Sequence, residues 1–533
     1  MTSPGEGVAV RERDGRPDGE RLSRWWTALG TNGLRAFWIT AVGVLVLQLV
    51  GLVIYSTVLF HRFDLTDDFA TYAQAWWLIA HGHLDPVNTI QAPSAPFWQS
   101  HFELAMWPIA LLGRIWPHAI QLLWLQDAAL VGTEWIVVVW VGALYATRAV
   151  RHRAAVAIAT LAFLVVNPWW YLTASFDVHF ETLGLPFVVW SAYSLWRGRV
   201  RTAVIVAAVG LLFGDVTALA LVCVGIAGLV SRRVRTVSGW RVPLIVMVAS
   251  LGWVVLITLL GANKSSGIVT NYGYLVGAAP TATSSWVASH LLVHPGHALH
   301  VLSGRLPAIG RVIASAGLLG VATPWGLVVS IGTLVPASLN VNRAFLSPVI
   351  AFQTLTVIPF VLVGTVMVLL YLGGGRAGAA AATGVGRWRV VTALAVAGGV
   401  VALSLVQNLP LYGTLRTDWW RVDAPAAATL RSALPEVPAR AEVIASQGVI
   451  GRFADRTSVY PLLASPQQFV IDARQVVFVV APAQGIESIP AQLSDADIAS
   501  LVGRLHATVV ERGNGVTVLS WLPPPGVRAI VLP

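Results

Sequence analysis

The chain is poor in charge, in cysteine and in lysine. Only 11% of its 533 residues are charged, whereas 56% are hydrophobic; a soluble domain carries about 25% charged residues. The apolar residues recur in runs of roughly 15–25, a length that crosses about 30 Å of hydrocarbon as a helix. Since a helix satisfies its own backbone hydrogen bonds in lipid, the composition excludes an ordinary soluble fold and predicts an all-α polytopic membrane bundle.

Cys223 is the single cysteine, so no intramolecular disulfide can form. It lies in an apolar run, where burial raises the pKa of a thiol, and this is typical of a small core residue rather than a nucleophile. The net charge of +10 does not indicate a nucleic-acid partner. From residue 407 to the end, ten acids balance ten bases, and the positive excess lies in short Arg-rich turns of the apolar part.

These Arg-rich turns set the direction of the expected spans. Arg148–Arg153, Arg197–Arg201 and Arg232–Arg235 mark loops on the cytoplasmic side. We therefore expect an N-terminus in the cytoplasm and a C-terminal part on the outer face. The three predicted parts are a disordered cytoplasmic arm (1–36), a transmembrane domain (37–406) and a small extracytoplasmic α/β domain (407–533).

The apolar pattern predicts about eleven spans. The first three lie at about 37–60, 119–147 and 154–167, and the fourth ends near 196. Two short helices within 202–230 are the fifth and sixth. The remaining spans lie at about 242–262, 306–322, 325–338, 354–373 and 389–406. The tail alternates between strand-like and helical segments. Its expected strands are Glu442–Ser446, Gln475–Val480, Ala507–Glu511 and Val516–Trp521, with a helix at Asp495–Leu505.

The acids are distributed unevenly along the chain. None lies between Asp215 and Asp418, so carboxylate chemistry in the membrane domain has to use the ten acids from Asp64 to Asp215. A charge at membrane depth costs a few kcal/mol or more and usually has a functional or pairing reason. Most of these acids fall in two loops that we expect outside, residues 61–103 and 167–181.

Carboxylate, imidazole and indole groups occur together in both loops, and this combination suits a sugar site, where a carboxylate deprotonates a hydroxyl and aromatic rings stack on the sugar. We predict Asp68 and Asp177 as catalytic residues. The predicted substrate-binding residues are Gln74, Trp76, His101, His179, Glu181 and Asp215. Alternatively, the carboxylates are solvated loop charges and most tryptophans form an aromatic belt at the membrane interface.

The segment between Lys264 and Arg343 is basic and contains no acid. A lipid-linked phosphate would be attracted there, and Arg343 is the candidate phosphate ligand; headgroup snorkelling is the alternative. Four histidines from His290 to His300 have helical spacing, but Pro295–Gly296 interrupts the helix and no local carboxylate or cysteine completes a metal site. A divalent metal ion therefore remains a candidate cofactor without an assigned ligand set.

Several short motifs resemble one family. The stretch Asp68-Phe-Ala-Thr-Tyr-Ala-Gln74-Ala-Trp76 is similar to the Asp-Leu-Gly-x-x-x-Gln-x-x-Trp-like start of the domain-of-unknown-function 2079 (DUF2079) family of predicted bacterial membrane proteins. The motifs that follow in order are His101-Phe, Gln126 in a Leu-rich segment, Asp177-Val-His179-Phe-Glu181, Gly214-Asp215 and the tail segment Pro438–Pro461.

The resemblance implies a GT-C-like fold, since this family is grouped with the GT-C membrane glycosyltransferases, which use polyprenyl-phosphate sugars. In those enzymes an acid of the first outside loop acts at the reaction centre, and Asp68 matches that position; Asp177 matches the acid of the second loop. The implied function is transfer of a sugar from a lipid-linked donor to an envelope glycan, lipid or protein, at the outer face of the bacterial plasma membrane.

Two other functions stay open at this point. A transporter or flippase of a lipid-linked substrate predicts charged residues in the middle of spans, and Asp127 and Asp215 are placed in that way. A non-catalytic scaffold of envelope assembly would instead use the tail as its working part.

Overall fold

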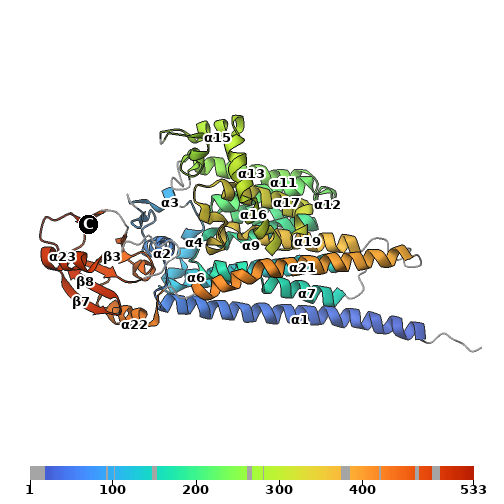
Figure 1. Cartoon of the computed structure of the whole chain (residues 1–533), viewed down its shortest axis with the longest axis horizontal. Helices are drawn as coiled ribbons and strands as arrows, with labels where there is room; N and C mark the ends of the chain where they lie inside the picture. The colour runs from blue at the N-terminus through green and yellow to red at the C-terminus, as the bar shows by residue number, and fades with distance from the viewer. Residues whose placement is uncertain are drawn as a thin grey trace, which may run out of the picture.

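The computed structural model describes residues 18–532 except 92–93, 101, 147–152, 261–266, 280, 374–383, 419–421, 463–466 and 483–492. A bundle of long helices forms one part of the molecule, and a small sheet caps one of its ends (Figure 1). The long helices are α1 (Asp18–His61), α6 (Ile120–Ala146), α7 (Arg153–Val165), α9 (Phe180–Arg197), α10 (Val200–Leu211), α11 (Asp215–Val230), α13 (Arg241–Leu259), α16 (Gly296–Ser315), α17 (Pro324–Leu339), α19 (Val357–Gly373) and α21 (Gly384–Asp418).

Each range predicted to span the membrane contains a helix, and the mostly helical fold is confirmed. In the part of the chain that the structure describes, five helices are long and apolar enough to cross a membrane: 35–61, 120–146, 241–259, 352–372 and 395–413. Shorter apolar helices lie at 106–115, 200–211, 215–230 and 324–339. The total of about eleven spans remains a prediction.

Three helices have bounds that differ from the predicted ranges. α1 begins at Asp18, so residues 18–36 are helical rather than disordered; residues 1–17 lie outside the described residues. α16 covers Gly296–Ser315 instead of 306–322, and α21 continues to Asp418, past the boundary predicted at 406/407. Once an apolar stretch has formed a helix, adding further residues avoids the nucleation cost, so polar flanks extend the helix beyond the apolar run.

Short elements connect the long helices. They are α2 (Asp67–Ala80), β1 (Val87–Asn88), β2 (Ala95–Pro96), α3 (Phe97–Ser100), α4 (Met106–Ala110), α5 (Leu112–Ile115), α8 (Pro168–Ser175), α12 (Arg232–Val237), α14 (Ile268–Tyr272), η2 (Gly273–Val276), α15 (Ser284–Val293), η3 (Leu319–Ala322), η4 (Arg343–Leu346), η5 (Pro348–Ile350) and α18 (Phe352–Leu355).

The tail folds around a five-stranded sheet with strand order β4-β3-β6-β8-β7. Strands β4, β3 and β6 are parallel, whereas β8 and β7 join antiparallel. Its elements are α22 (Ala424–Ala433), η6 (Leu434–Glu436), β3 (Glu442–Ser446), η7 (Ile450–Phe453), β4 (Val459–Leu462), β5 (Gln467–Val470), β6 (Val476–Val480), α23 (Asp495–Leu505), β7 (Thr508–Gly513), β8 (Val516–Trp521) and β9 (Ala529–Leu532).

The small α/β region is therefore confirmed, with β3, β8 and α23 at the predicted bounds. Strand β4 was not predicted because Pro461 interrupts its pattern. It is an edge strand, where a missing backbone N–H is tolerated.

The sheet and α2 share one hydrophobic core. Leu65 and Phe69 pack in the same buried cluster as Ile450 and Phe453 of η7, and α2 lies between the bundle and the sheet (Figure 1). Gly451 makes this approach possible: its N–H donates to the Leu65 carbonyl at 3.2 Å, and an added Cβ would lie 2.6 Å from Leu65 Cβ. The loop that carries Asp68 and the tail therefore lie at the same end of the bundle.

Candidate functional site

A cavity of about 460 Å³ opens at the end of the bundle that faces the sheet. One of its walls is acidic and comes from the first halves of α2, α9 and α11 and from the loop before α4. The groups on this wall are Asp68, Tyr72, Glu103, His179, Glu181 and Asp215. The structure thus brings together four of the predicted site residues: Asp68, His179, Glu181 and Asp215.

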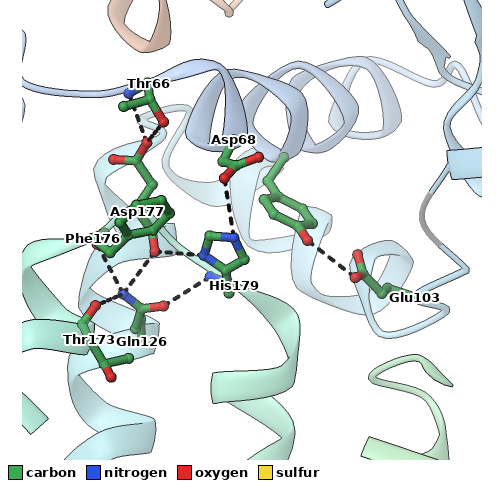
Figure 2. A network of polar contacts seen from close by, with 9 residues as sticks. Thr66, Asp68, Glu103, Gln126, Thr173, Phe176, Asp177 and His179 are labelled. Carbon is green, nitrogen blue, oxygen red and sulfur yellow. Dashed lines mark hydrogen bonds and ion pairs between the residues drawn. The ribbon is translucent and has the colours of Figure 1, made fainter. Parts of the chain in front are cut away.

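Asp68 lies in the first turn of α2, where a negative charge also stabilises the helix. Its side chain is 34% exposed, and its Oδ2 lies 3.4 Å from Nε2 of the buried His179 (Figure 2). Asp68 can therefore contact both a ligand in the cavity and an imidazole fixed by the protein.

His179 is held on three sides. Its backbone N–H donates to Gln126 Oε1 at 2.9 Å, and its Nδ1 lies 3.0 Å from the Asp177 carbonyl (Figure 2). The ring stacks on Phe352, with centroids 3.5 Å apart and 19° between the planes. Because a carbonyl oxygen can only accept a hydrogen bond, Nδ1 must carry a proton and donate it to the Asp177 carbonyl. This hydrogen bond orients the ring so that Nε2 faces Asp68.

The charge of His179 follows from two opposing effects. Burial lowers its pKa, but the hydrogen bond and charge of Asp68, together with the charge of Glu181, outweigh burial and raise the pKa of His179 to about 9. At neutral pH the ring is therefore an imidazolium that faces the Asp68 carboxylate.

Asp177 does not line the cavity. Its Oδ2 accepts hydrogen bonds from the backbone N–H of Thr66, at 2.7 Å, and from the Thr66 hydroxyl (Figure 2). Thr66 is the N-cap residue of α2. Asp177 therefore contacts the start of the helix that carries Asp68, and its predicted catalytic role stays a prediction.

Glu103 is a cavity residue that the sequence prediction missed. It is buried, and the Tyr72 hydroxyl donates to its Oε1 at 3.2 Å (Figure 2). Burial, followed by the charges of Glu103, Glu181 and Asp68, raises the pKa of Tyr72 well above its usual value, so this phenol is a neutral donor. Glu103 belongs to the stretch His101-Phe-Glu103, from which the sequence prediction takes only His101 as a substrate-binding residue. His101 lies outside the described residues.

Glu181 and Asp215 reach one wall because α9 and α11 approach closely at their first turns. Gly184 permits this contact, since a Cβ there would lie 2.5 Å from Thr217 Oγ1. Both acids lie in the first turn of their helices, where a carboxylate is stabilised by the helix dipole. Gly214, with φ of 101°, makes the turn before Asp215 and also lies against Glu103.

Gln74 and Trp76 lie away from the cavity, so the structure does not place them where the predicted substrate contacts would be. The Gln74 amide nitrogen donates to Thr89 Oγ1 at 2.8 Å and to the Thr457 carbonyl at 3.1 Å, which joins α2 to the tail. Trp76 is buried against Gly113. Arg343 is exposed and is not a lining residue, although Phe345 of the same 3-10 turn is.

The rest of the cavity wall is largely apolar. It comes from the membrane helices α11, α13 and α17 and from the segment of η4 and α18; its apolar residues include Val216, Leu219, Val254, Pro336, Ala337 and Phe352. No lysine or arginine is among the described residues that line the cavity. Within the described ranges, no three His, Cys, Asp or Glu side chains are arranged to hold a metal ion.

Two solved structures of ArnT from Cupriavidus metallidurans are similar to this chain. The structure bound to undecaprenyl phosphate is 14% identical, with a TM-score of 0.47, and the match covers 90% of this chain and 98% of that chain. The apo structure is 12% identical, with a TM-score of 0.43, and the match covers 92% and 98%. No curated protein matches the chain.

The family described as "Predicted membrane protein (DUF2079)" matches residues 62–518. This range includes every described acid of the cavity wall and most of the tail. The match confirms the resemblance found in the sequence motifs, and the chain belongs to the DUF2079 family of predicted membrane proteins.

Proposed function

We propose that this protein is a GT-C-like membrane glycosyltransferase that moves a sugar from a polyprenyl-phosphate donor to an acceptor of the cell envelope. The observation that carries the proposal is the position of Asp68: a partly exposed carboxylate at a cavity, with a buried imidazole held against it. The cavity volume of about 460 Å³ falls within the range of roughly 300–1,000 Å³ that small-molecule sites occupy.

Asp68 accepts the proton of an acceptor hydroxyl in the proposed reaction. The hydroxyl oxygen forms a bond to the anomeric carbon while the bond from that carbon to the phosphate oxygen breaks, and the phosphate leaves with the bonding electron pair. Direct displacement inverts the anomeric carbon. His179 fixes the orientation of the carboxylate, and a positioned general base contributes typically 10²–10⁴-fold to such a rate.

The two kinds of cavity wall support an amphipathic donor. The acidic wall offers acceptors for sugar hydroxyl groups, whereas Leu219 and Ala337 face the cavity from helices of the membrane bundle, where a polyprenyl chain would lie. A phosphate would be repelled by the acids, so it belongs at the mouth of the cavity. Arg343, two residues before the lining residue Phe345, is the candidate for that contact.

The transferase proposal is tested by replacing Asp68 with Asn and following sugar transfer from a polyprenyl-phosphate donor into envelope material of isolated membranes. We expect a loss of roughly 10²–10⁴-fold, compared at equal amounts of folded protein, because the substitution also removes the partner of the buried His179 ring and lowers thermal stability. Asp85→Asn is the matched control, because Asp85 is an exposed aspartate of the same outer loop and contacts Trp98 rather than the cavity. Full transfer by Asp68→Asn would contradict the proposal.

Two buried acids favour a second candidate, transport of a lipid-linked substrate. Asp127 and Glu134 are fully buried in α6, and Glu134 Oε1 accepts a hydrogen bond from Gln48 of α1 at 2.8 Å. The transferase reaction does not use them, and acids at membrane depth usually have a function. This candidate predicts that Glu134→Gln slows movement of a fluorescent polyprenyl-phosphate across proteoliposome membranes, whereas Asp68→Asn leaves it unchanged.

A further inference from the structure

The segment that joins α14 to the buried part of α16 forms a projection from the side of the bundle. We call residues 284–306, which comprise α15 and the first half of α16, the lateral hairpin. Figure 1 shows α15 projecting sideways near the end of the bundle that carries the sheet. The second half of α16 is anchored in the bundle, since Val312, Ala314 and Ser315 are buried.

The lateral hairpin exposes large apolar side chains at its tip. Leu292 is 83% exposed and Val293 is 70% exposed, immediately before the turn at Pro295–Gly296. Leu299 and Leu306, seven residues apart and so on one face of α16, are also more than half exposed. An exposed apolar surface of this kind marks an interaction site.

One face of α15 carries aromatic and imidazole rings. Trp286, His290 and Val293 have the spacing of one helix face, and the Trp286 and His290 rings stack with centroids 3.7 Å apart. Amphipathic rings next to exposed aliphatic groups are typical of the boundary between hydrocarbon and headgroups. The pattern therefore fits a helix that lies in the membrane interface.

The lateral hairpin has a cation and no acid, which favours anionic lipids. It carries no acid, because the sequence has none between Asp215 and Asp418. It does carry Arg305 and four histidines, of which His294, His297 and His300 are exposed. Arg305 is a permanent cation and complements an anionic headgroup, and the imidazole N–H groups of the exposed histidines can donate hydrogen bonds to lipid phosphates.

We propose that the lateral hairpin docks on anionic phospholipid of the leaflet that surrounds this end of the bundle. Leu292 and Val293 insert at the boundary between headgroups and acyl chains, and the histidines and Arg305 contact lipid phosphates. This site is separate from the proposed sugar site and does not depend on sugar transfer.

Docking also affects the cavity. α14 contributes Asn271 and Tyr272 to the cavity wall, and the chain continues directly into η2, which precedes α15. Tyr274 of η2 contacts the His297 ring edge-on, with centroids 6.4 Å apart. The bound lipid would therefore hold one wall of the cavity in place.

The single cysteine makes a direct test possible. In a Cys223→Ser background, Leu292→Cys is labelled with an environment-sensitive fluorophore, and the full-length protein is reconstituted into vesicles. One set contains phosphatidylcholine alone and the other an equimolar mixture of phosphatidylcholine and phosphatidylglycerol. Lipids spin-labelled near the headgroup quench a label that lies in the interface.

Two matched positions calibrate the label. Leu251→Cys on the exposed face of α13, a candidate span, reports a lipid-facing site, and Val509→Cys on β7 of the sheet reports an aqueous site. We expect the label at 292 to be quenched several-fold more strongly than the label at 509, and more in anionic than in neutral vesicles. Replacing His294, His297 and Arg305 with Gln should remove the difference between the two lipids.

Two results would overturn the proposal. Quenching at 292 as weak as at 509 in both vesicles would show that the hairpin stays in water. Equal quenching at 292 in neutral and anionic vesicles would show that anionic phospholipid is not the partner. Neither result bears on Asp68, so failure of this proposal is distinguishable from failure of the transferase proposal.

Discussion

Asp177 Oδ2 accepts hydrogen bonds from the backbone N–H of Thr66, at 2.7 Å, and from the Thr66 hydroxyl, and so joins the loop before α9 to the N-cap of α2. Asp68 follows two residues later, and its carboxylate faces His179, which lies two residues after Asp177. The two loops are therefore tied twice, once through the start of α2 and once through the Asp68–His179 pair. We therefore expect a substitution of Asp177 to displace the Asp68 carboxylate, although Asp177 itself does not line the cavity.

Asp177→Ala should lower both stability and sugar transfer. It leaves the buried N–H of Thr66 without this acceptor, which costs roughly 1–3 kcal/mol of unfolding free energy. Asp177→Asn keeps an oxygen at the same place and should recover most of both properties. Thermal unfolding and transfer rates of the two variants check this. A catalytic carboxylate would behave differently, because Asn would then be as inactive as Ala at unchanged stability.

The Asp68–His179 pair should make stability depend on pH. The pKa of His179 is raised from 6.5 to about 9, so the folded state binds the proton more tightly than the unfolded state. The resulting stabilisation is fully present below about pH 6.5 and is lost as the pH rises through about 9. The melting temperature should therefore fall over this window. His179→Gln should flatten the change, whereas His300→Gln, at an exposed site, should retain it.

Arg452 should hold the tail against the end of α1. Its Nη1 donates to the Phe60 carbonyl at 2.8 Å, and its guanidinium lies over the Phe60 ring at 4.1 Å and the Phe63 ring at 4.9 Å. Arg452→Leu removes the hydrogen bond and both cation–π contacts, worth roughly 1–3 kcal/mol together. We expect faster hydrogen exchange in α2 and in η7.

Arg504→Leu is the control for that measurement, because Arg504 is an exposed residue at the end of α23. It should leave exchange in α2 unchanged. Equal exchange in wild type and Arg452→Leu would mean that the shared apolar core alone keeps the tail in place.

The helices could be predicted from sequence because the length of an apolar run is enough to specify a span. The residues of the cavity wall could be predicted in part, because the Arg-rich turns place both acidic loops at one end of the bundle. The cavity wall does bring together four of the predicted residues: Asp68, His179, Glu181 and Asp215. Tyr72 was also within reach, since it lies four residues after Asp68 and so on the same face of the predicted helix.

The same helix explains why Gln74 and Trp76 do not line the cavity. Gln74 lies six residues after Asp68, and at about 100° per residue it points well away from the cavity face. Trp76 lies a further two residues along the axis, beyond the cavity. The contacts of Gln74 with Thr457 and of Asp177 with Thr66 depend on how distant segments meet. Spacing along the chain does not carry that information.

Gly451 provides the sharpest test of how closely the tail approaches α2. A Cβ at this position would lie 2.6 Å from Leu65 Cβ and 2.8 Å from the Phe69 ring, both of which are buried. Neither group can move away without a backbone shift, so Gly451→Ala should cost roughly 1–3 kcal/mol of unfolding free energy through overpacking. Because Leu65 precedes Thr66, the same shift should reduce transfer by Asp68.

Gly503→Ala is the matched substitution for Gly451→Ala. Gly503 lies in α23, and nothing stands within 4 Å of an added Cβ. Alanine there should be neutral or should stabilise the helix by up to about 1 kcal/mol. Thermal unfolding of both variants, with transfer measured alongside, separates the contact from a general effect of alanine. A Gly451→Ala protein as stable as Gly503→Ala would mean that η7 does not press against the start of α2, and that the tail does not help to position Asp68.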